Sequence, residues 1–290
     1  ERCAQMDKRG GYQAMITQHA WMFLSSFEKL RAKLQLIDTV NMAHLGARSF
    51  DEIGGEVVQT TSYVMRSSHT KGYKGTYCRL IVGDSEKAKA EMFVSGENRY
   101  VAEQDNFSKI PGSPVAYWAT NRLMKDFEDG VSLSSYAEPK QGMATMDNNK
   151  YLRRWYEVEI GKCCFHAQSL GDAKESGKRW FPYNKGGDYR KWYGNFCYLV
   201  NWEKDGEQLK ADATELYGSY SKRIYNTQFF FKPSITWSKI SSGSFSVRCI
   251  SDGCLFDVAG CSIFVKENLY YYFAALLNSK IVGAILRMIS

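Results

Sequence analysis

The sequence lacks the short motifs by which most nucleotide-dependent and hydrolytic enzymes are identified. None of its 24 glycines is separated from another by a single residue, so there is no G-x-G loop to hold a nucleotide cofactor. None of its five prolines is adjacent to another. It has no G-x-S-x-G elbow, and its four scattered histidines offer no evident triad. The 290 residues therefore contain no self-sufficient active site that motifs can identify.

Metal-binding cysteine patterns are also missing. None of the eight cysteines forms a C-x-x-C pair, and none lies at a usual metal spacing from a histidine. The nearest approach is Cys163-Cys164, but adjacent residues on a strand point to opposite faces and chelate poorly. We expect reduced, partly buried thiols and no metal site, as in a cytoplasmic protein.

No targeting or membrane-spanning segment is evident. The chain opens Glu1-Arg2-Cys3, without an initiator methionine or an apolar signal core, and it begins within a predicted helix. We therefore expect it to be part of a longer bacterial cytoplasmic protein. The one long apolar stretch, 269–290, is interrupted by Asn278, Lys280 and Arg287, which are costly at membrane depth. It predicts a buried terminal helix and no membrane partner.

The composition is that of a globular protein. Hydrophobic residues make up 44% and aromatic residues 14% of a chain long enough for two modest domains. The formal net charge is +7. Such a charge suits a polyanionic partner, but charge alone is a weak indicator because many proteins without such a partner are equally basic.

The first 95 residues alternate between strand and helix patterns. Short apolar or β-branched runs predict strands at 12–17, 39–45, 56–66 and 76–82. Apolar residues at helical spacing predict a helix over 19–36. Residues 1–95 are thus expected to form an α/β unit, the last part of a Rossmann-like sheet with an antiparallel edge.

The rest of the chain predicts a bridge and a second domain. In residues 96–149, a Pro-Gly turn cluster precedes a helix over 116–128 and a linker over 129–149. Residues 150–290 are expected to form an α+β domain. Its predicted strands lie at 196–202, 229–237, 245–250 and 262–265, and its predicted helices at 203–223 and 267–288.

The clearest chemical signal lies between Ser176 and Asn195, where five basic residues and six aromatics accompany one acid. Lysine and arginine neutralise phosphates, arginine can bind a guanine edge, and aromatic rings can stack on bases. The alternative is a solvated basic loop whose aromatics pack locally. The candidate DNA contacts are Arg153, Arg154, Lys178, Arg179, Lys185, Arg190 and Lys191, with Trp180, Tyr183 and Trp192 as possible wedges or platforms.

A second signal is the turn that ends in Phe50 and precedes Gly54-Gly55. A phenylalanine in a loop at the end of a strand can offer its face to a flat ligand. On sequence grounds alone, such a residue is more often part of the core.

These segments resemble adenine-N6 DNA methyltransferases, above all those of BREX-type phage-exclusion systems and then the type IIG restriction-methylation enzymes. The matching runs of the first half include Gly10-Gly11-Tyr12, Ser26-Phe27-Glu28-Lys29-Leu30-Arg31, Val40-Asn41-Met42-Ala43-His44-Leu45-Gly46 and Val64-Met65-Arg66. Those of the second half include Gln141-Gly142-Met143-Ala144-Thr145, Trp180-Phe181-Pro182-Tyr183-Asn184, Lys232-Pro233-Ser234-Ile235-Thr236-Trp237 and Ala275-Leu276-Leu277-Asn278-Ser279-Lys280.

The resemblance implies an enzyme that binds S-adenosylmethionine and flips its target adenine out of double-stranded DNA. It implies that residues 1–95 end the catalytic domain, that Phe50 stacks on the extruded base, and that residues 150–290 recognise the target. The family's glycine-rich loop and Asn/Asp-Pro-Pro-Tyr/Phe motif are absent and are expected upstream of Glu1. The chain by itself is thus expected to be inactive.

Two alternatives remain open at this point. The intact protein could be a non-methylating DNA-binding scaffold or sensor that works with partner subunits in phage defence. The chain could also be a stand-alone DNA- or RNA-binding protein unrelated to methylation, although its α/β first part argues against this.

Overall fold

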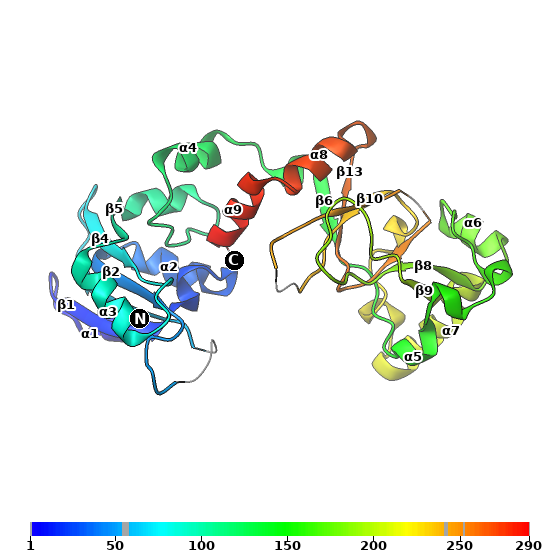
Figure 1. Ribbon diagram of the computed structural model, residues 1–290, viewed down its shortest axis with the longest axis horizontal. Coiled ribbons are helices and arrows are strands. Elements are labelled where there is room, and N and C mark those ends of the chain that lie inside the picture. The colour runs from blue at the N-terminus through cyan, green and yellow to red at the C-terminus, as the bar shows by residue number, and fades with distance from the viewer. Residues whose placement is uncertain (1, 54–57, 241–242, 252, 290) are drawn as a thin grey trace. The chain divides into compact units, whose positions relative to one another are not determined.

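The computed structural model describes residues 2–53, 58–240, 243–251 and 253–289 (Figure 1). Its internal contacts divide the chain into two compact units. The N-terminal unit comprises Glu1–Gly130 with Leu286–Ser290, and the C-terminal unit comprises Val131–Ile285. Each unit has its own β-structure and its own buried hydrophobic core.

The N-terminal unit is built on a five-stranded sheet with the order β1-β3-β2-β4-β5. The strands are β1 (Tyr12–Gln18), β2 (Asp38–Gly46), β3 (Thr60–Arg66), β4 (Lys74–Arg79) and β5 (Arg99–Glu103). Strand β3 lies antiparallel between β1 and β2, so β1 and β2 run in the same direction. Strand β4 pairs with β2 in parallel, and β5 pairs with β4 antiparallel.

Helical segments precede, connect and follow these strands. They are α1 (Arg2–Met6), η1 (His19–Met22), η2 (Ser25–Phe27), α2 (Glu28–Leu34), α3 (Glu86–Ser95), η3 (Gln104–Lys109) and α4 (Asn121–Asp129). The core of the unit is rich in aromatic residues, and the stacked rings of Tyr77 and Tyr117 lie 4.8 Å apart at its centre.

The strands predicted at 12–17 and 39–45 are confirmed as β1 and β2. The helix predicted over 19–36 is wrong as one element, since Leu24 is extended and separates η1 from η2 and α2. The buried guanidinium of Arg31 stabilises this break, because it donates to the backbone carbonyls of Trp21 and Leu24 at 2.9 and 2.8 Å. Those carbonyls are therefore satisfied without a continuous helix.

Three other boundaries differ from the sequence prediction. Strand β3 begins at Thr60, and residues 56 and 57 of the predicted strand 56–66 lie outside the described residues. Strand β4 ends at Arg79, three residues before the predicted end. Helix α4 begins at Asn121, five residues later than predicted, because the side chain of Thr120 accepts a hydrogen bond from the Leu123 amide and caps the helix.

Two four-stranded sheets form the framework of the C-terminal unit, with the orders β11-β10-β13-β6 and β12-β8-β9-β7. The strands are β6 (Ala137–Lys140), β7 (Leu152–Arg154), β8 (Trp180–Asn184), β9 (Tyr198–Asn201), β10 (Ser234–Thr236), β11 (Arg248–Ile250), β12 (Leu255–Phe256) and β13 (Ser262–Val265). The main helices are α5 (Asn148–Tyr151), α6 (Leu170–Glu175), α7 (Glu203–Tyr217) and α8 (Tyr270–Leu277). Helix α9 (Lys280–Ile289) begins in this unit, and its residues from Leu286 onward belong to the N-terminal unit.

Residues 129–149, which the sequence predicts as a linker, instead contain β6 and the start of α5. Strand β6 pairs with β13 from Ala137 opposite Val265, more than a hundred residues away. No local pattern reports such a partner. The predicted helix over 203–223 ends earlier, at Tyr217, because Gly218 adopts a left-handed conformation with φ 79°.

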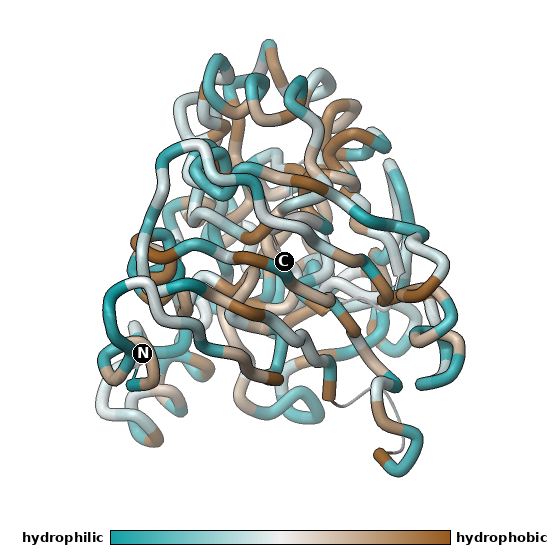
Figure 2. Tube along the Cα trace, turned by 90° about the vertical axis from the view of Figure 1, so that its left-hand side faces the viewer, coloured by the Kyte–Doolittle hydropathy of each residue, from teal (hydrophilic) through white to brown (hydrophobic). Residues whose placement is uncertain are grey.

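The predicted terminal helix over 267–288 is divided into α8 and α9. The division lies at Asn278, whose buried side-chain amide exchanges two 3.0 Å hydrogen bonds with the backbone of Val247. No helix among the described residues is long and apolar enough to cross a membrane. Hydrophobic residues occur along the chain in short runs separated by polar ones (Figure 2).

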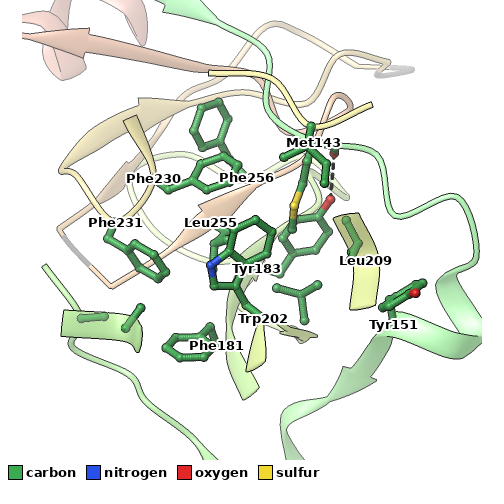
Figure 3. Packing of buried hydrophobic residues seen from close by; sticks show 14 of the residues in the cluster. Met143, Tyr151, Phe181, Tyr183, Trp202, Leu209, Phe230, Phe231, Leu255 and Phe256 are labelled. Atoms are coloured by element: carbon green, nitrogen blue, oxygen red, sulfur yellow. Dashed lines mark hydrogen bonds between the residues drawn. The ribbon is translucent and has the colours of Figure 1, made fainter. Parts of the chain in front are cut away.

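The main core of the C-terminal unit lies against the sheet that contains β8 and β9 (Figure 3). Phe181, Tyr183 and Trp202 are almost completely buried in it. The hydroxyl of Tyr183 is hydrogen-bonded to the backbone carbonyl of Met143 at 2.9 Å and to Asp257 Oδ2 at 2.6 Å. These bonds satisfy a phenol group that would otherwise be costly to bury.

Candidate nucleic-acid interface

The segment that the sequence singles out forms β8 and the loop that follows it. We call residues 185–197 the basic-aromatic loop. Its base is closely packed, since a Cβ on Gly186 (φ +77°) would lie 2.8 Å from the carbonyl oxygen of Ala259. Further along, the amide of Trp192 donates to Val247 and its carbonyl accepts from Cys249, both at 2.9 Å. Main-chain bonds thus hold the loop against β11.

The tip of this loop presents cations and aromatic rings to solvent. Arg190 and Lys191 are exposed, and Trp192 and Tyr193 are 53% and 74% exposed. The Lys191 ammonium donates to the carbonyl oxygen of Asn278 at 3.0 Å, which fixes its position and keeps its charge. Among the described residues, no carboxylate forms an ion pair with either cation. Both charges are therefore available to a polyanion.

A second group of predicted residues lines a groove of about 620 Å³, here called the arginine groove. The guanidinium groups of Arg153 and Arg179 lie 5.7 and 5.3 Å from the ring centre of Trp180. Trp180 is only 7% exposed, so it supports the two cations and is not a free platform for a base. This corrects its predicted role.

The charge of the arginine groove is partly offset. It contains four cations, Arg153, Lys162, Lys178 and Arg179, and three carboxylates, Glu157, Glu159 and Glu203. Lys178 also donates to the carbonyl oxygen of Gly161 at 2.6 Å. The groove is therefore less basic than the loop tip.

The remaining candidates are placed differently. Tyr183 is 1% exposed, and burial raises the pKa of its hydroxyl well above the usual value, so it is a core residue and not a base platform. Lys185 lies between Asp257 Oδ2 at 3.3 Å and Asn148 Oδ1 at 3.0 Å. Arg154 is exposed, and its guanidinium lies 5.9 Å from the ring centre of Tyr198.

Phe50 lies where β1 and β2 end in the N-terminal unit. We call this end of the sheet its carboxyl edge. Strands β1 and β2 end at Gln18 and Gly46, and both of these residues pair with Thr60. The Thr60 hydroxyl donates to the hydroxyl of Ser49 at 2.9 Å, which holds the turn before Phe50 at this edge. Phe50 is 39% exposed and is therefore not a core residue.

The same edge contains a histidine pair that sequence reasoning missed. His19 Nδ1 lies 2.8 Å from His44 Nε2, and His44 Nδ1 lies 3.1 Å from the hydroxyl of Tyr117. Burial lowers the pKa of both imidazoles, and that of His44 falls to about 3 because the charges of His19, Arg79 and Lys89 add to the effect. Both rings are thus neutral at pH 7. Twenty-five residues separate the pair, so no local motif reveals it.

Comparison with known proteins finds two adenine-specific methyltransferases with similar sequences. It is 42% identical over 298 residues to the adenine-specific methyltransferase PglX of Lacticaseibacillus casei (strain Zhang), in a match that covers 100% of this chain and 25% of PglX. It is 38% identical over 282 residues to the adenine-specific methyltransferase BrxX of Escherichia coli O9:H4 (strain HS), covering 95% of this chain and 22% of BrxX. The chain is a match to one segment of the adenine-specific methyltransferases.

The resemblance inferred from the sequence is thus confirmed over the whole chain, which spans about a quarter of the length of these methyltransferases. The fold is similar to that of MmeI, a type IIL restriction-modification enzyme whose structure contains DNA. The TM-score is 0.54 at 11% identity, and the match covers 97% of this chain and 37% of MmeI. No protein-family model matches the chain.

Proposed function

We propose that this chain is the DNA-recognising part of a site-specific adenine-N6 DNA methyltransferase, which transfers a methyl group from S-adenosylmethionine to adenine. The observation that carries this proposal is the similarity to two adenine-specific methyltransferases over 100% and 95% of the chain. The likeness to the fold of a restriction-modification enzyme that binds DNA supports it. The non-methylating scaffold is the weaker alternative, because both curated relatives bear the name of the enzyme.

The C-terminal unit is the proposed target-recognition domain. Arg190 and Lys191 would neutralise phosphates, since they are exposed and free of carboxylate partners among the described residues. Trp192 is the aromatic candidate that remains from the sequence prediction. Arg153, Lys178 and Arg179 would contribute further along the backbone, with less effect because the acids of the arginine groove offset part of their charge. The exposed Arg154 would contribute in the same way.

The N-terminal unit is the proposed end of the catalytic domain. Strands β1 and β2 run in the same direction and are connected by a helical segment, which supports a Rossmann-like origin of the sheet. In such sheets ligands bind beyond the carboxyl ends of the strands. Phe50 lies at that end of β2, and we propose that its ring stacks on the extruded adenine.

The residues of this chain do not by themselves fit S-adenosylmethionine. The sequence has no G-x-G loop and no adjacent prolines, so no catalytic step is assigned to its side chains. We propose that the cofactor site and the Pro-Pro motif belong to the portion of the protein that corresponds to the remaining three quarters of its relatives. Partner subunits of a phage-defence system are a further part of this proposal.

The test is duplex DNA binding by the 290-residue chain as a function of salt. A DNA-recognising unit should bind a mixed-sequence 30-base-pair duplex and lose affinity about tenfold or more between 50 and 200 mM salt, because phosphate contacts release counterions. No binding at 50 mM salt would contradict the proposal. For the complete protein, motif-specific N6-methyladenine in incubated DNA would support the enzyme over the scaffold, and its absence would favour the scaffold.

A further inference from the structure

The C-terminal unit contains a pocket that the proposed function does not use. Its volume is about 660 Å³, within the range of sites that hold small organic ligands. Six aromatic rings line it: Tyr193, Phe196, Phe229, Phe264, Tyr270 and Tyr271. They come from the basic-aromatic loop, from η8 (Thr227–Phe229), from β13 and from α8. We call this site the aromatic pocket.

The rings are arranged as fixed surfaces beside freely accessible ones. The rings of Phe229 and Phe264 pack 4.5 Å apart, and the hydroxyl of Tyr270 is held by the carbonyl oxygens of Ser234 and Ile250 at 2.9 and 2.8 Å. Tyr193 and Tyr271, by contrast, are 74% and 79% exposed. The rings of Tyr193 and Tyr271 are therefore accessible to a flat ligand in the pocket.

The charge around the pocket favours an anionic ligand. Among the lining residues that the structure describes, Lys232 carries the one charge. Its ammonium lies 5.6 Å from the ring centre of Phe229. The ammonium of Lys140 lies 5.2 Å from the same ring but is ion-paired with Glu138 at 2.9 Å, so the positive charge of the pocket comes from Lys232. A ligand that combines a flat ring with a neighbouring negative charge matches both features, and a nucleotide has this combination.

The backbone of the loop also supports a role in binding. Trp192 has φ +72°, a conformation that bulky residues rarely adopt, and it immediately precedes Tyr193. The two main-chain bonds to Val247 and Cys249 maintain this conformation. Strain of this kind is concentrated at ligand sites. It places Tyr193 and Phe196 at the pocket, with their ring centres 4.9 Å apart.

We propose that the aromatic pocket holds one nucleobase unstacked from DNA, with the adjoining phosphate on Lys232. This inference rests on the proposed function, because it takes DNA as the partner of the C-terminal unit. It adds a second place for a displaced base, separate from the adenine site proposed at Phe50. Every base has a flat aromatic face, so the pocket should accept any base rather than read one.

The experiment compares two single-stranded ligands of equal charge. The 290-residue chain is titrated, at 50 mM salt, with a labelled ten-nucleotide thymidine oligomer and with an abasic oligomer of the same length. The thymidine oligomer should bind on the order of five- to a hundredfold more tightly, since stacking of a base on aromatic side chains has an effect of this size. Equal affinities for the two oligomers would overturn the inference.

Variants assign the effect to the pocket. Tyr193→Ala with Tyr271→Ala should remove the preference for the thymidine oligomer, and both side chains are exposed enough to be replaced without unfolding. Tyr272→Ala is the matched control, because Tyr272 is 62% exposed on the same helix and lines a different groove. Lys232→Gln should weaken the binding of both oligomers. It should also reduce the salt dependence of the affinity by the contribution of about one phosphate contact. A double variant that keeps the full preference would contradict the assignment.

The outcomes separate this inference from the proposed function. If the chain binds duplex DNA but binds the two oligomers equally, the proposed function stands and the inference about the pocket is wrong. If the chain prefers the thymidine oligomer but does not bind duplex DNA, the inference about the pocket stands and the proposed function is wrong.

Discussion

Nδ1 of His19 lies 2.8 Å from Nε2 of His44, which joins the residue that follows β1 to the last part of β2. Only one hydrogen can occupy the space between these nitrogens, so the pair accommodates neutral rings and resists protonation. The pair lies at the sheet edge that also carries the turn of Phe50. The stability of this edge should therefore depend on pH.

The first prediction concerns acid sensitivity. The pKa of His44 is about 3 in the folded chain and about 6.5 in an unfolded one, so the unfolded state binds more protons below pH 6.5. Stability is then complete above pH 6.5 and is lost as the pH falls toward 3. The N-terminal unit should lose about 2 kcal/mol of unfolding free energy between pH 7 and pH 5. Urea unfolding followed by tryptophan fluorescence measures this loss.

His44→Gln should be less stable at pH 7 and should lose most of the pH dependence between pH 7 and 5. His69→Gln is the control, because His69 bridges two carboxylates at the other end of the sheet and is about a third exposed. If both variants kept the pH dependence of the parent chain, the titrating group would lie elsewhere.

The second prediction concerns the charges of the basic-aromatic loop. Arg190→Ala with Lys191→Ala should lower the affinity for duplex DNA about tenfold or more at 100 mM salt and reduce the salt slope by about two. Lys87→Ala with Arg122→Ala removes the same charge from exposed sites on α3 and α4. This control should leave the slope unchanged. An unchanged slope in the loop variant would show that the loop faces away from the DNA.

The third prediction separates structural from binding aromatics. Tyr183→Phe removes the hydroxyl that bonds to Asp257 and Met143 and should destabilise the C-terminal unit by about 2 kcal/mol. Trp192→Ala removes a half-exposed ring and should affect DNA affinity more than stability. Urea unfolding and DNA titration of both variants provide the comparison. The assignment fails if Tyr183→Phe is as stable as the parent chain.

The fourth prediction concerns Arg31, which is 3% exposed and donates to three backbone carbonyls, those of Trp21, Leu24 and Gly112. Arg31→Met leaves these acceptors without a donor and should cost about 3 kcal/mol or more of unfolding free energy. The exposed Lys29 on the same helix provides the control Lys29→Met, which should change stability by less than about 0.5 kcal/mol.

The fifth prediction tests Phe50 in the complete protein. Phe50→Ala should lower the rate of adenine methylation, whereas Phe50→Trp should retain it, because the proposed role needs a flat ring and not a particular one. Methylation of duplex DNA by each variant is the measurement. Equal rates for the alanine and tryptophan variants would exclude a stacking role.

Local sequence pattern was enough to place β1, β2 and β13, because each has a compact run of strand-forming residues. It was not enough to find the break after η1, where the Arg31 guanidinium donates to the carbonyl oxygens of Trp21 and Leu24 and also to that of Gly112, 81 residues away. It also missed β6, whose partner strand lies near the end of the chain. These features are set by contacts between distant residues, which periodicity does not report.

The same limit applies to the candidate site. The segment from Ser176 to Asn195 contains exposed cations and aromatics of the loop, but its composition does not indicate which of its aromatic residues are buried. Strand β8 is buried at Trp180, Phe181, Tyr183 and Asn184, with both of its faces covered, so no alternation marked which aromatics point inward. Only the tertiary structure separates these from the exposed Trp192 and Tyr193.

The two attachments of the basic-aromatic loop differ in what they demand of its sequence. Its base at Gly186 tolerates no side chain, whereas the contact at Trp192 is made by backbone atoms. That contact needs a residue that keeps its N–H and can adopt φ +72°, but it needs no particular side chain. Exposed residues such as Tyr189, Arg190 and Tyr193 can therefore be substituted without changing the main-chain contacts that hold the loop. Related proteins could diverge in what they recognise by exchanging a handful of exposed positions, while the surrounding architecture is inherited unchanged.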